Sequence, residues 1–82
     1  MYFLYILYSI DLDRYYIGYT QDISMRLKEH LWEHKGFTSK AKDWELKYFE
    51  TFENQTEAIS RERQIKKWKS RKLIEKLISS HT

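Results

Sequence analysis

The sequence contains no cysteine, no proline and only two glycines. Without cysteine, no disulfide can hold the fold together, and thiolate metal sites and thiol redox chemistry are excluded. The apolar run at residues 1–8 is far too short to span a bilayer, lacks a basic flank and has no small-residue cleavage site. We therefore expect a soluble protein of the cytoplasm that has no membrane partner.

Repeats, low-complexity tracts and linkers are also absent, and 82 residues is the length of one small domain. We therefore expect a single domain over residues 1–82. Its thin core can be filled by 7 tyrosines, 4 phenylalanines and 3 tryptophans, because each aromatic side chain can bury roughly 150–250 Å². With 41% hydrophobic and 33% charged residues, the chain is globular rather than disordered.

The net charge of +3 conceals an uneven distribution of charge along the chain. Residues 61–76 carry eight basic side chains against two glutamates, so the rest of the chain is negative overall. Such an asymmetry favours a polyanionic partner, although a solvated helix face explains the cluster equally well when it is taken alone. The basic residues are Arg61, Arg63, Lys66, Lys67, Lys69, Arg71, Lys72 and Lys76.

Three segments of the sequence favour β-strands. Residues 2–8 are apolar at every position, which predicts a central strand covered on both faces. Residues 11–14 supply turn-forming side chains, and residues 15–19 resume a β-rich pattern, so the two segments predict a hairpin. Residues 44–49 alternate as in a half-buried strand, which we expect to continue to Phe52.

The first predicted helix follows the hairpin and carries two residues suited to phosphate chemistry. Asp22 is its expected N-cap and Gly36 its expected end, with a loop at residues 37–43. Arg26 and His30 stand four positions apart, so they share one face. Arginine matches phosphate oxygens bidentately and histidine moves a proton near neutral pH, whereas the pair taken alone is more often a solvated surface pair.

Two more helices complete the expected fold. Asn54 or Thr56 caps a second helix that continues to about residue 69, and Ser70 separates it from a short last helix. The resulting order is ββαβαα. We therefore predict an α+β fold, with a small three-stranded antiparallel sheet flanked by helices.

Glu62 is an acidic residue on an apolar stripe of the second predicted helix. Helical spacing places it one turn from Ala58 and Ile59 on one side and from Ile65 on the other, so its carboxylate is expected to face the sheet. A buried carboxylate is unfavourable unless it is paired or binds a metal. The two interpretations are a metal ligand and an ion pair with an arginine.

Tyrosines are dense in the predicted hairpin. Tyr5 and Tyr16 fall on strands expected to pair, which brings their phenols near one another. Any one buried tyrosine is more often a core residue with a satisfied hydroxyl than a catalytic group.

Taken together, these positions resemble the GIY-YIG nuclease family. Residues 15–18, Tyr-Tyr-Ile-Gly, contain the YIG half of its motif, and Tyr5 in Phe-Leu-Tyr keeps only the tyrosine of the first half. The resemblance covers essentially the whole chain and is strongest to the stand-alone single-domain branch related to the catalytic domain of excinuclease C. The remaining matched positions are Tyr16, Arg26, His30 and Glu62.

The resemblance implies a metal-dependent endonuclease. Glu62 would bind one Mg²⁺ or Mn²⁺, and Arg26 would neutralise the charge that gathers on the phosphoryl oxygens. Tyr16 would act as general base or position the attacking water, with Tyr5 and His30 in support. A free phenol has a pKa near 10, so a tyrosine base requires the metal or nearby cations.

The resemblance also implies a nucleic-acid partner, expected to be DNA. A domain of about eighty residues cannot both hold a nuclease core and read a long site. We therefore expect low sequence specificity and selection for branches, flaps or single strands, as in repair or recombination. The expected nucleic-acid-binding residues are Gly18, Lys40, Arg63, Lys66, Lys67, Lys69 and Arg71.

Two positions depart from the excinuclease branch and leave alternatives open. Tyr19 stands where that branch often has a lysine, and Ile74 stands where it has an asparagine. One alternative is a catalytically inactive nucleic-acid-binding module of the same fold, whose affinity falls with salt but does not need Glu62. Another is a protein-interaction domain whose basic helix meets an acidic partner, which predicts no affinity for DNA.

Overall fold

The computed structural model describes residues 1–32 and 43–80 of the chain. Their elements follow the order ββαβαα, so the predicted α+β fold is confirmed. No helix in these two segments is long and apolar enough to cross a membrane. The elements are β1 (Tyr2–Ser9), β2 (Arg14–Thr20), α1 (Ile23–Trp32), β3 (Glu45–Phe52), α2 (Gln55–Trp68) and α3 (Arg71–Ser79).

The three strands form one antiparallel sheet in the order β2-β1-β3. The prediction that the first strand is central is confirmed. Tyr5 lies opposite Gly18 on β2 and opposite Phe49 on β3. The register shifts along β3, because Ile6 pairs with Tyr48 whereas the next residue of β1 pairs with Leu46. This irregularity leaves Lys47 as the extra residue of the edge strand.

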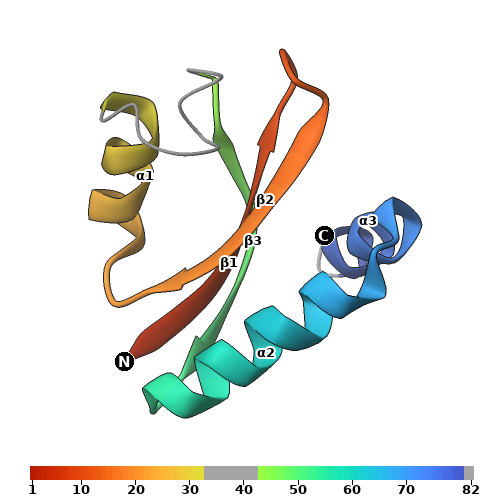
Figure 1. Cartoon of the computed structure of the whole chain (residues 1–82). Coiled ribbons are helices and arrows are strands. Elements are labelled where there is room, and N and C mark those ends of the chain that lie inside the picture. Colours follow the sequence, from red (N-terminus) through yellow and green to blue (C-terminus); the bar gives the residue numbers. More distant parts are fainter. Residues whose placement is uncertain (33–42, 81–82) are drawn as a thin grey trace.

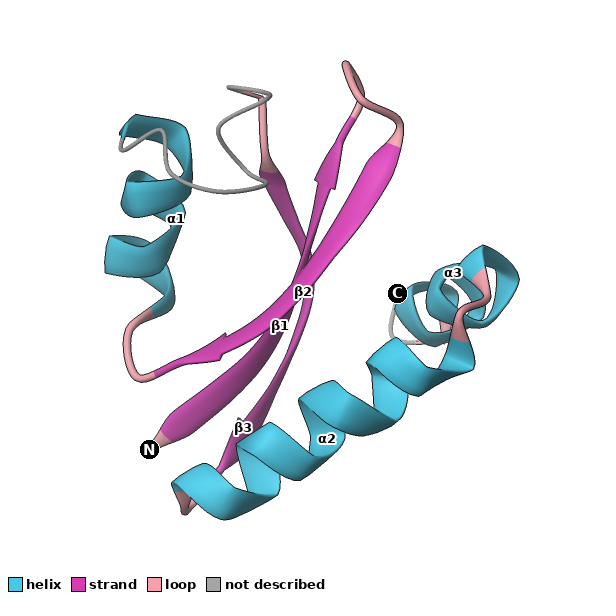
Figure 2. Cartoon of the chain, in the orientation of Figure 1, coloured by secondary structure: helices cyan, strands magenta, loops and turns pink. Residues whose placement is uncertain are grey.

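The sheet lies between two helical layers, with α1 on one face and α2 and α3 on the other (Figures 1 and 2). Because successive side chains of a strand point to opposite faces, β1 contributes to a core on each side. Leu4 and Ile6 pack with Ile65 of α2, whereas Tyr5 and Leu7 pack on the side of α1. All four of these β1 side chains are at most 2% exposed, so the unalternating apolar run is explained.

The helix starts are set by side chains that accept backbone N–H groups. Asp22 caps α1 as predicted, since its carboxylate accepts the N–H of Met25 at 3.0 Å. Asn54 accepts the N–H of Glu57 at 3.0 Å, so it caps α2, and the alternative cap at Thr56 is wrong. The predicted end of the first helix at Gly36 lies outside the described residues.

A short break separates α2 from α3, as predicted. Lys69 ends α2 with a left-handed backbone (φ 47°), and the Ser70 hydroxyl accepts the N–H of Leu73 to begin α3. Ile74, Leu77 and other apolar residues of α3 then pack against the core on the α2 side.

Arg71 of α3 bonds that helix to the β1–β2 hairpin. The Arg71 guanidinium donates to the Asp13 carboxylate at 2.6 Å and to Glu75 at 3.2 Å, and it lies 5.8 Å and 5.6 Å from the ring centroids of Tyr8 and Tyr15. Hydrogen bonds from Arg71 and Tyr8 lower the pKa of Asp13 to about 2. We call the hairpin latch the set of five residues Tyr8, Asp13, Tyr15, Arg71 and Glu75.

Candidate active site

Tyr5 lies at the centre of the α1 face, directly against Gly18. Its side chain is 2% exposed. A Cβ atom on Gly18 would lie 2.6 Å from the Tyr5 hydroxyl oxygen and 2.8 Å from Cζ, closer than such contacts can be. Gly18 therefore makes room for the phenol. The nucleic-acid contact of Gly18 stays a prediction.

The Tyr5 phenol is held in its protonated form. Burial raises its pKa to about 12, against a hydrogen bond from Arg26 Nε at 3.4 Å that lowers it, while the charges of Tyr16 and Glu62 raise it further. At neutral pH the phenol therefore keeps its proton and is not a base, and its oxygen accepts the hydrogen bond from Arg26. This state fits the supporting role predicted for Tyr5.

Tyr16 lies beside Tyr5 on the same face of the sheet. It is two positions before Gly18 on β2, and its ring centroid is 6.3 Å from that of Tyr5. The buried Trp44 also packs against Tyr16, with ring centroids 6.3 Å apart in a T-shaped arrangement. From the sequence, Trp44 was predicted only as a strand residue. Its packing against the Tyr16 ring was not predicted, because no local pattern joins residues 16 and 44.

Arg26 reaches the tyrosines from α1. It is partly buried and donates to Tyr5, so it is more than a solvated surface residue. The backbone of His30 lies one turn further along α1, but its side chain is outside the part of the structure that is described. Lys40, a predicted nucleic-acid contact, also lies outside the described residues.

Glu62 comes from α2, where it stands between the fully buried Ala58 and Ile65. Its side chain is 18% exposed, and Lys66 Nζ donates to its Oε1 atom at 2.7 Å. The carboxylate is largely buried as predicted, but its partner is this lysine and not the arginine considered as the alternative. Burial is the main cause of the raised pKa of Tyr5, and the negative charge of Glu62 raises it slightly further.

The donor set fits a single magnesium or manganese ion held mainly by water and substrate. Among the described residues, no group of three or more histidine, aspartate or glutamate side chains gathers into an all-protein cage. Mg²⁺ keeps several waters and commonly takes one or two carboxylates plus substrate phosphates. Glu62 supplies one hard carboxylate. Pairs of this i,i+4 kind on a helix are worth only about 0.3–0.5 kcal/mol, so a divalent ion would be able to displace the Lys66 ammonium.

The structure divides the eight basic residues of 61–76 into three groups, of which the first is Lys66 alone, paired with Glu62. Arg61 is tied to Glu50 at 3.0 Å and lies over the Trp68 ring, and Arg71 belongs to the hairpin latch, so both have structural tasks. The exposed members that make no ion pair with any described residue are Arg63, Lys67, Lys69, Lys72 and Lys76.

Arg14 is a functional candidate that the sequence interpretation assigned only to a turn. It is the first residue of β2 and stands two positions before Tyr16, so period-two alternation puts both on one face of the strand. That spacing was the available signal. Arg14 is exposed and makes no ion pair within the described part of the chain.

We expect Tyr5 to titrate about two pH units above an ordinary tyrosine. Subtracting the alkaline titration of the Tyr5→Phe variant from that of the wild type, followed by tyrosinate absorbance, should leave a transition near pH 12. The folded-state pKa of Tyr5 lies above the unfolded value of 10.0, so folding favours the protonated phenol. The stability that this protonated phenol contributes is complete below pH 10 and is lost between pH 10 and 12. A difference transition near pH 10 would show that Tyr5 is accessible to water.

Comparison with known proteins identifies the family. A model of the GIY-YIG catalytic domain matches residues 1–76. No curated protein matches significantly. The solution NMR structure of a UPF0213 protein from Bacillus halodurans is 31% identical, covers 96% of this chain and 84% of that chain, and has a TM-score of 0.59. Because the family model spans nearly all of the sequence, the chain belongs to the GIY-YIG catalytic-domain family.

Proposed function

We propose that this protein is a divalent-metal-dependent endonuclease that hydrolyses phosphodiester bonds in DNA. We further propose low sequence specificity, a preference for branched or partly single-stranded substrates, and a repair or recombination role in the cytoplasm. The observation that carries the proposal is the Tyr5–Arg26 hydrogen bond beside Tyr16. A largely buried carboxylate, Glu62, is present on α2 in addition. A carboxylate placed among phosphate-binding groups repels phosphate unless a cation lies between them.

Each residue of the cluster has a task suited to its chemistry. Glu62 would hold Mg²⁺ or Mn²⁺ through a carboxylate oxygen, and the bound ion would polarise the scissile phosphate and stabilise the leaving oxygen. Arg26 would donate to the phosphoryl oxygens, where negative charge gathers. The protonated Tyr5 hydroxyl accepts a hydrogen bond from Arg26 Nε and would hold the guanidinium in position beside the phosphate.

Tyr16 would orient the attacking water through its hydroxyl group, or, in its phenolate form, take up the proton of that water. The new bond joins the water oxygen to phosphorus, and the bond to the leaving oxygen breaks. Tyr16 is partly exposed, unlike the buried Tyr5, and therefore has access to water. His30, one helical turn beyond Arg26, would support proton transfer.

A second candidate function is nucleic-acid binding without turnover. The observation that favours it is the Lys66–Glu62 pair, because a carboxylate already neutralised by a lysine needs no metal. The exposed Arg63, Lys67 and Lys69 would then supply phosphate contacts. The two candidates differ in whether bound DNA is cut.

Incubation with supercoiled plasmid and with a labelled branched DNA tests the proposal. With Mg²⁺ or Mn²⁺ we expect nicked and linear plasmid and discrete cleavage of the branched DNA, and with EDTA we expect neither. An even ladder on linear duplex would agree with low sequence specificity. Salt-sensitive binding with no cutting in either metal would favour the binding module.

A further inference from the structure

Arg14 is an exposed arginine beside the candidate active site that no carboxylate of the described chain neutralises. It is the first residue of β2 and makes no ion pair with any described residue. Arg61 and Arg71 differ from it, because each is bonded to a carboxylate that joins a helix to the sheet or to its hairpin.

One acidic side chain bonds to the strand neighbour of Arg14 but not to Arg14 itself. Ser9 lies directly opposite Arg14 on β1, and its hydroxyl donates to Asp43 Oδ1 at 2.6 Å. The other carboxylate oxygen of Asp43 accepts the backbone N–H of Asp11 at 2.9 Å. Both oxygens therefore serve the β1–β2 turn, and the Arg14 guanidinium is available to an anionic ligand.

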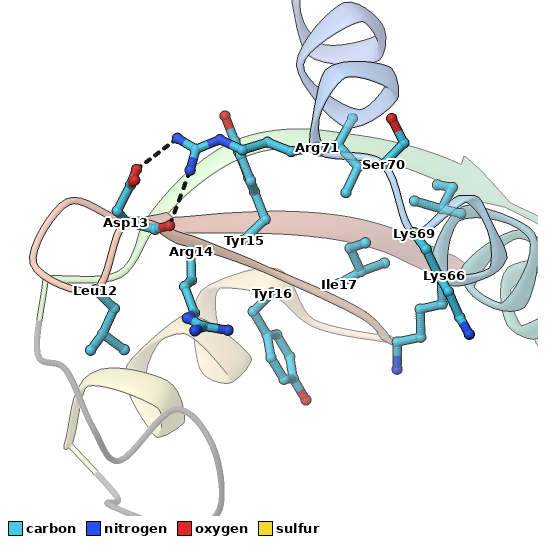
Figure 3. A pocket seen from close by; sticks show the side chains of 12 residues that line it. Leu12, Asp13, Arg14, Tyr15, Tyr16, Ile17, Lys66, Lys69, Ser70 and Arg71 are labelled. Carbon is cyan, nitrogen blue, oxygen red and sulfur yellow. Dashed lines mark hydrogen bonds and ion pairs between the residues drawn. The ribbon is translucent and has the colours of Figure 1, made fainter.

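Arg14 projects from the same side of β2 as Tyr16. Figure 3 shows these two side chains leaving the strand in one direction, whereas Tyr15 and Ile17 leave it in the other. Tyr16 in turn lies beside Tyr5, with ring centroids 6.3 Å apart. Arg14 and Tyr16 both line a pocket of about 640 Å³, so a ligand can reach them from solvent.

The spacing of Arg14 and Tyr16 along β2 matches the repeat of a nucleic-acid backbone. Two positions along a strand correspond to about 6.6 Å, which is similar to the separation of successive phosphates in a nucleic-acid strand. A strand whose scissile phosphate lies at Tyr16 can therefore bring its next phosphate to Arg14 when it follows β2 towards the β1–β2 turn. Arginine suits this position because its fixed donors bind phosphate oxygens bidentately.

We propose that Arg14 binds the phosphate next to the scissile one, on the side of the β1–β2 turn, and thereby aligns the strand with Tyr16. The inference rests on the proposed nuclease function and adds a substrate-positioning residue to it. This phosphate takes no part in the exchange of bonds, so the contact is equally strong in the bound substrate and in the transition state. Its loss should therefore raise KM and leave kcat unchanged.

Kinetics and binding of the Arg14→Gln variant measure this contact. The KM for a labelled branched DNA in Mg²⁺ should rise about tenfold, as the loss of one charged hydrogen-bonded contact allows, with kcat within about twofold of the wild type. In EDTA, the DNA affinity measured by fluorescence anisotropy should fall by a similar factor. The slope of log affinity against log salt concentration should decrease by about one.

Lys72→Gln is the matched control. It removes one positive charge from an exposed residue of α3, on the opposite side of the sheet from α1 (Figure 1). This variant should keep the KM, the affinity and the salt slope of the wild type, and circular dichroism should show that both variants fold. Equal changes in the two variants would mean that only net charge matters and would overturn the inference.

A chemical change in the DNA locates the contact. Branched substrates would each carry one uncharged methylphosphonate, at successive positions around the mapped cut. At one neighbour of the scissile phosphate, this change should raise the KM of the wild type about tenfold and that of Arg14→Gln less than about twofold. If every position affected the two proteins equally, Arg14 would not bind a phosphate next to the cut.

The outcomes separate this inference from the proposed function. If the wild type cuts DNA and Arg14→Gln cuts it with the wild-type KM, the inference fails and the nuclease proposal stands. If no DNA is cut in Mg²⁺ or Mn²⁺, the nuclease proposal fails. A lower affinity and salt slope in Arg14→Gln, but not in Lys72→Gln, would then keep Arg14 as a phosphate contact, and unchanged values would overturn both.

Discussion

Replacing Glu62 by glutamine is expected to reduce metal-dependent cleavage at least about a hundredfold, because the loss of a metal's charge stabilisation raises the barrier by several kcal/mol. Glutamine keeps the shape of the side chain and its place between Ala58 and Ile65, so the fold should not change. DNA affinity should stay the same or increase, since Lys66 then loses its carboxylate partner and is available to phosphate. Plasmid cleavage rates and anisotropy in EDTA measure the two effects.

Glu57→Gln is the matched control for this variant. Glu57 lies in the first turn of the same helix, is exposed and makes no ion pair with any described residue. Its substitution should leave cleavage within about twofold of the wild type, as is usual for surface changes. If Glu62→Gln instead cut DNA at nearly the wild-type rate in Mg²⁺ and Mn²⁺, Glu62 would not be the metal ligand.

Substituting Gly18 by alanine is expected to destabilise the protein by about 1–3 kcal/mol, as overpacking does in a filled core. The added Cβ would lie 2.6 Å from the Tyr5 hydroxyl oxygen, and the surrounding ring is too deeply buried to move freely. For a domain of this size, that loss lowers the melting temperature by roughly 5–20 °C. Cleavage should also fall, because the displaced phenol no longer meets Arg26.

A double-mutant cycle separates this clash from a general effect of the added methyl group. Tyr5→Leu removes the hydroxyl and the ring carbon that Gly18→Ala would strike. In that background, the further cost of Gly18→Ala should nearly vanish, giving a coupling of about 1 kcal/mol or more in urea unfolding. Additive effects would mean that Tyr5 does not lie against Gly18.

Features that depend on local sequence were predictable. The Asp22 cap and the break at Ser70 follow from side chains within a few positions of the groups they satisfy. The pairing of the first two strands through a short turn was enough to predict that Tyr5 and Tyr16 lie near one another. Helical spacing correctly placed Glu62 on the buried stripe of α2.

Features that depend on distant contacts were not predictable in the same way. Glu62 is paired with Lys66, one turn away on the same helix. The sequence alone does not show which of several nearby cationic side chains contacts a carboxylate in an apolar stripe. Arg71 was predicted only as a nucleic-acid contact, because nothing in its local sequence indicates a bond to Asp13, 58 residues away. The room that Gly18 leaves for Tyr5 likewise exists only after the strands have paired.

The hairpin latch also has a consequence for the order in which the chain assembles. The β1–β2 hairpin needs only the first twenty residues, so it can form early from local contacts. Arg71 can bind Asp13 only after the long chain segment between them has folded so that its two ends meet. Closing a segment of this length has an unfavourable conformational entropy. During synthesis, the rings of Tyr8 and Tyr15 must therefore wait for the last helix to emerge before Arg71 can cover them.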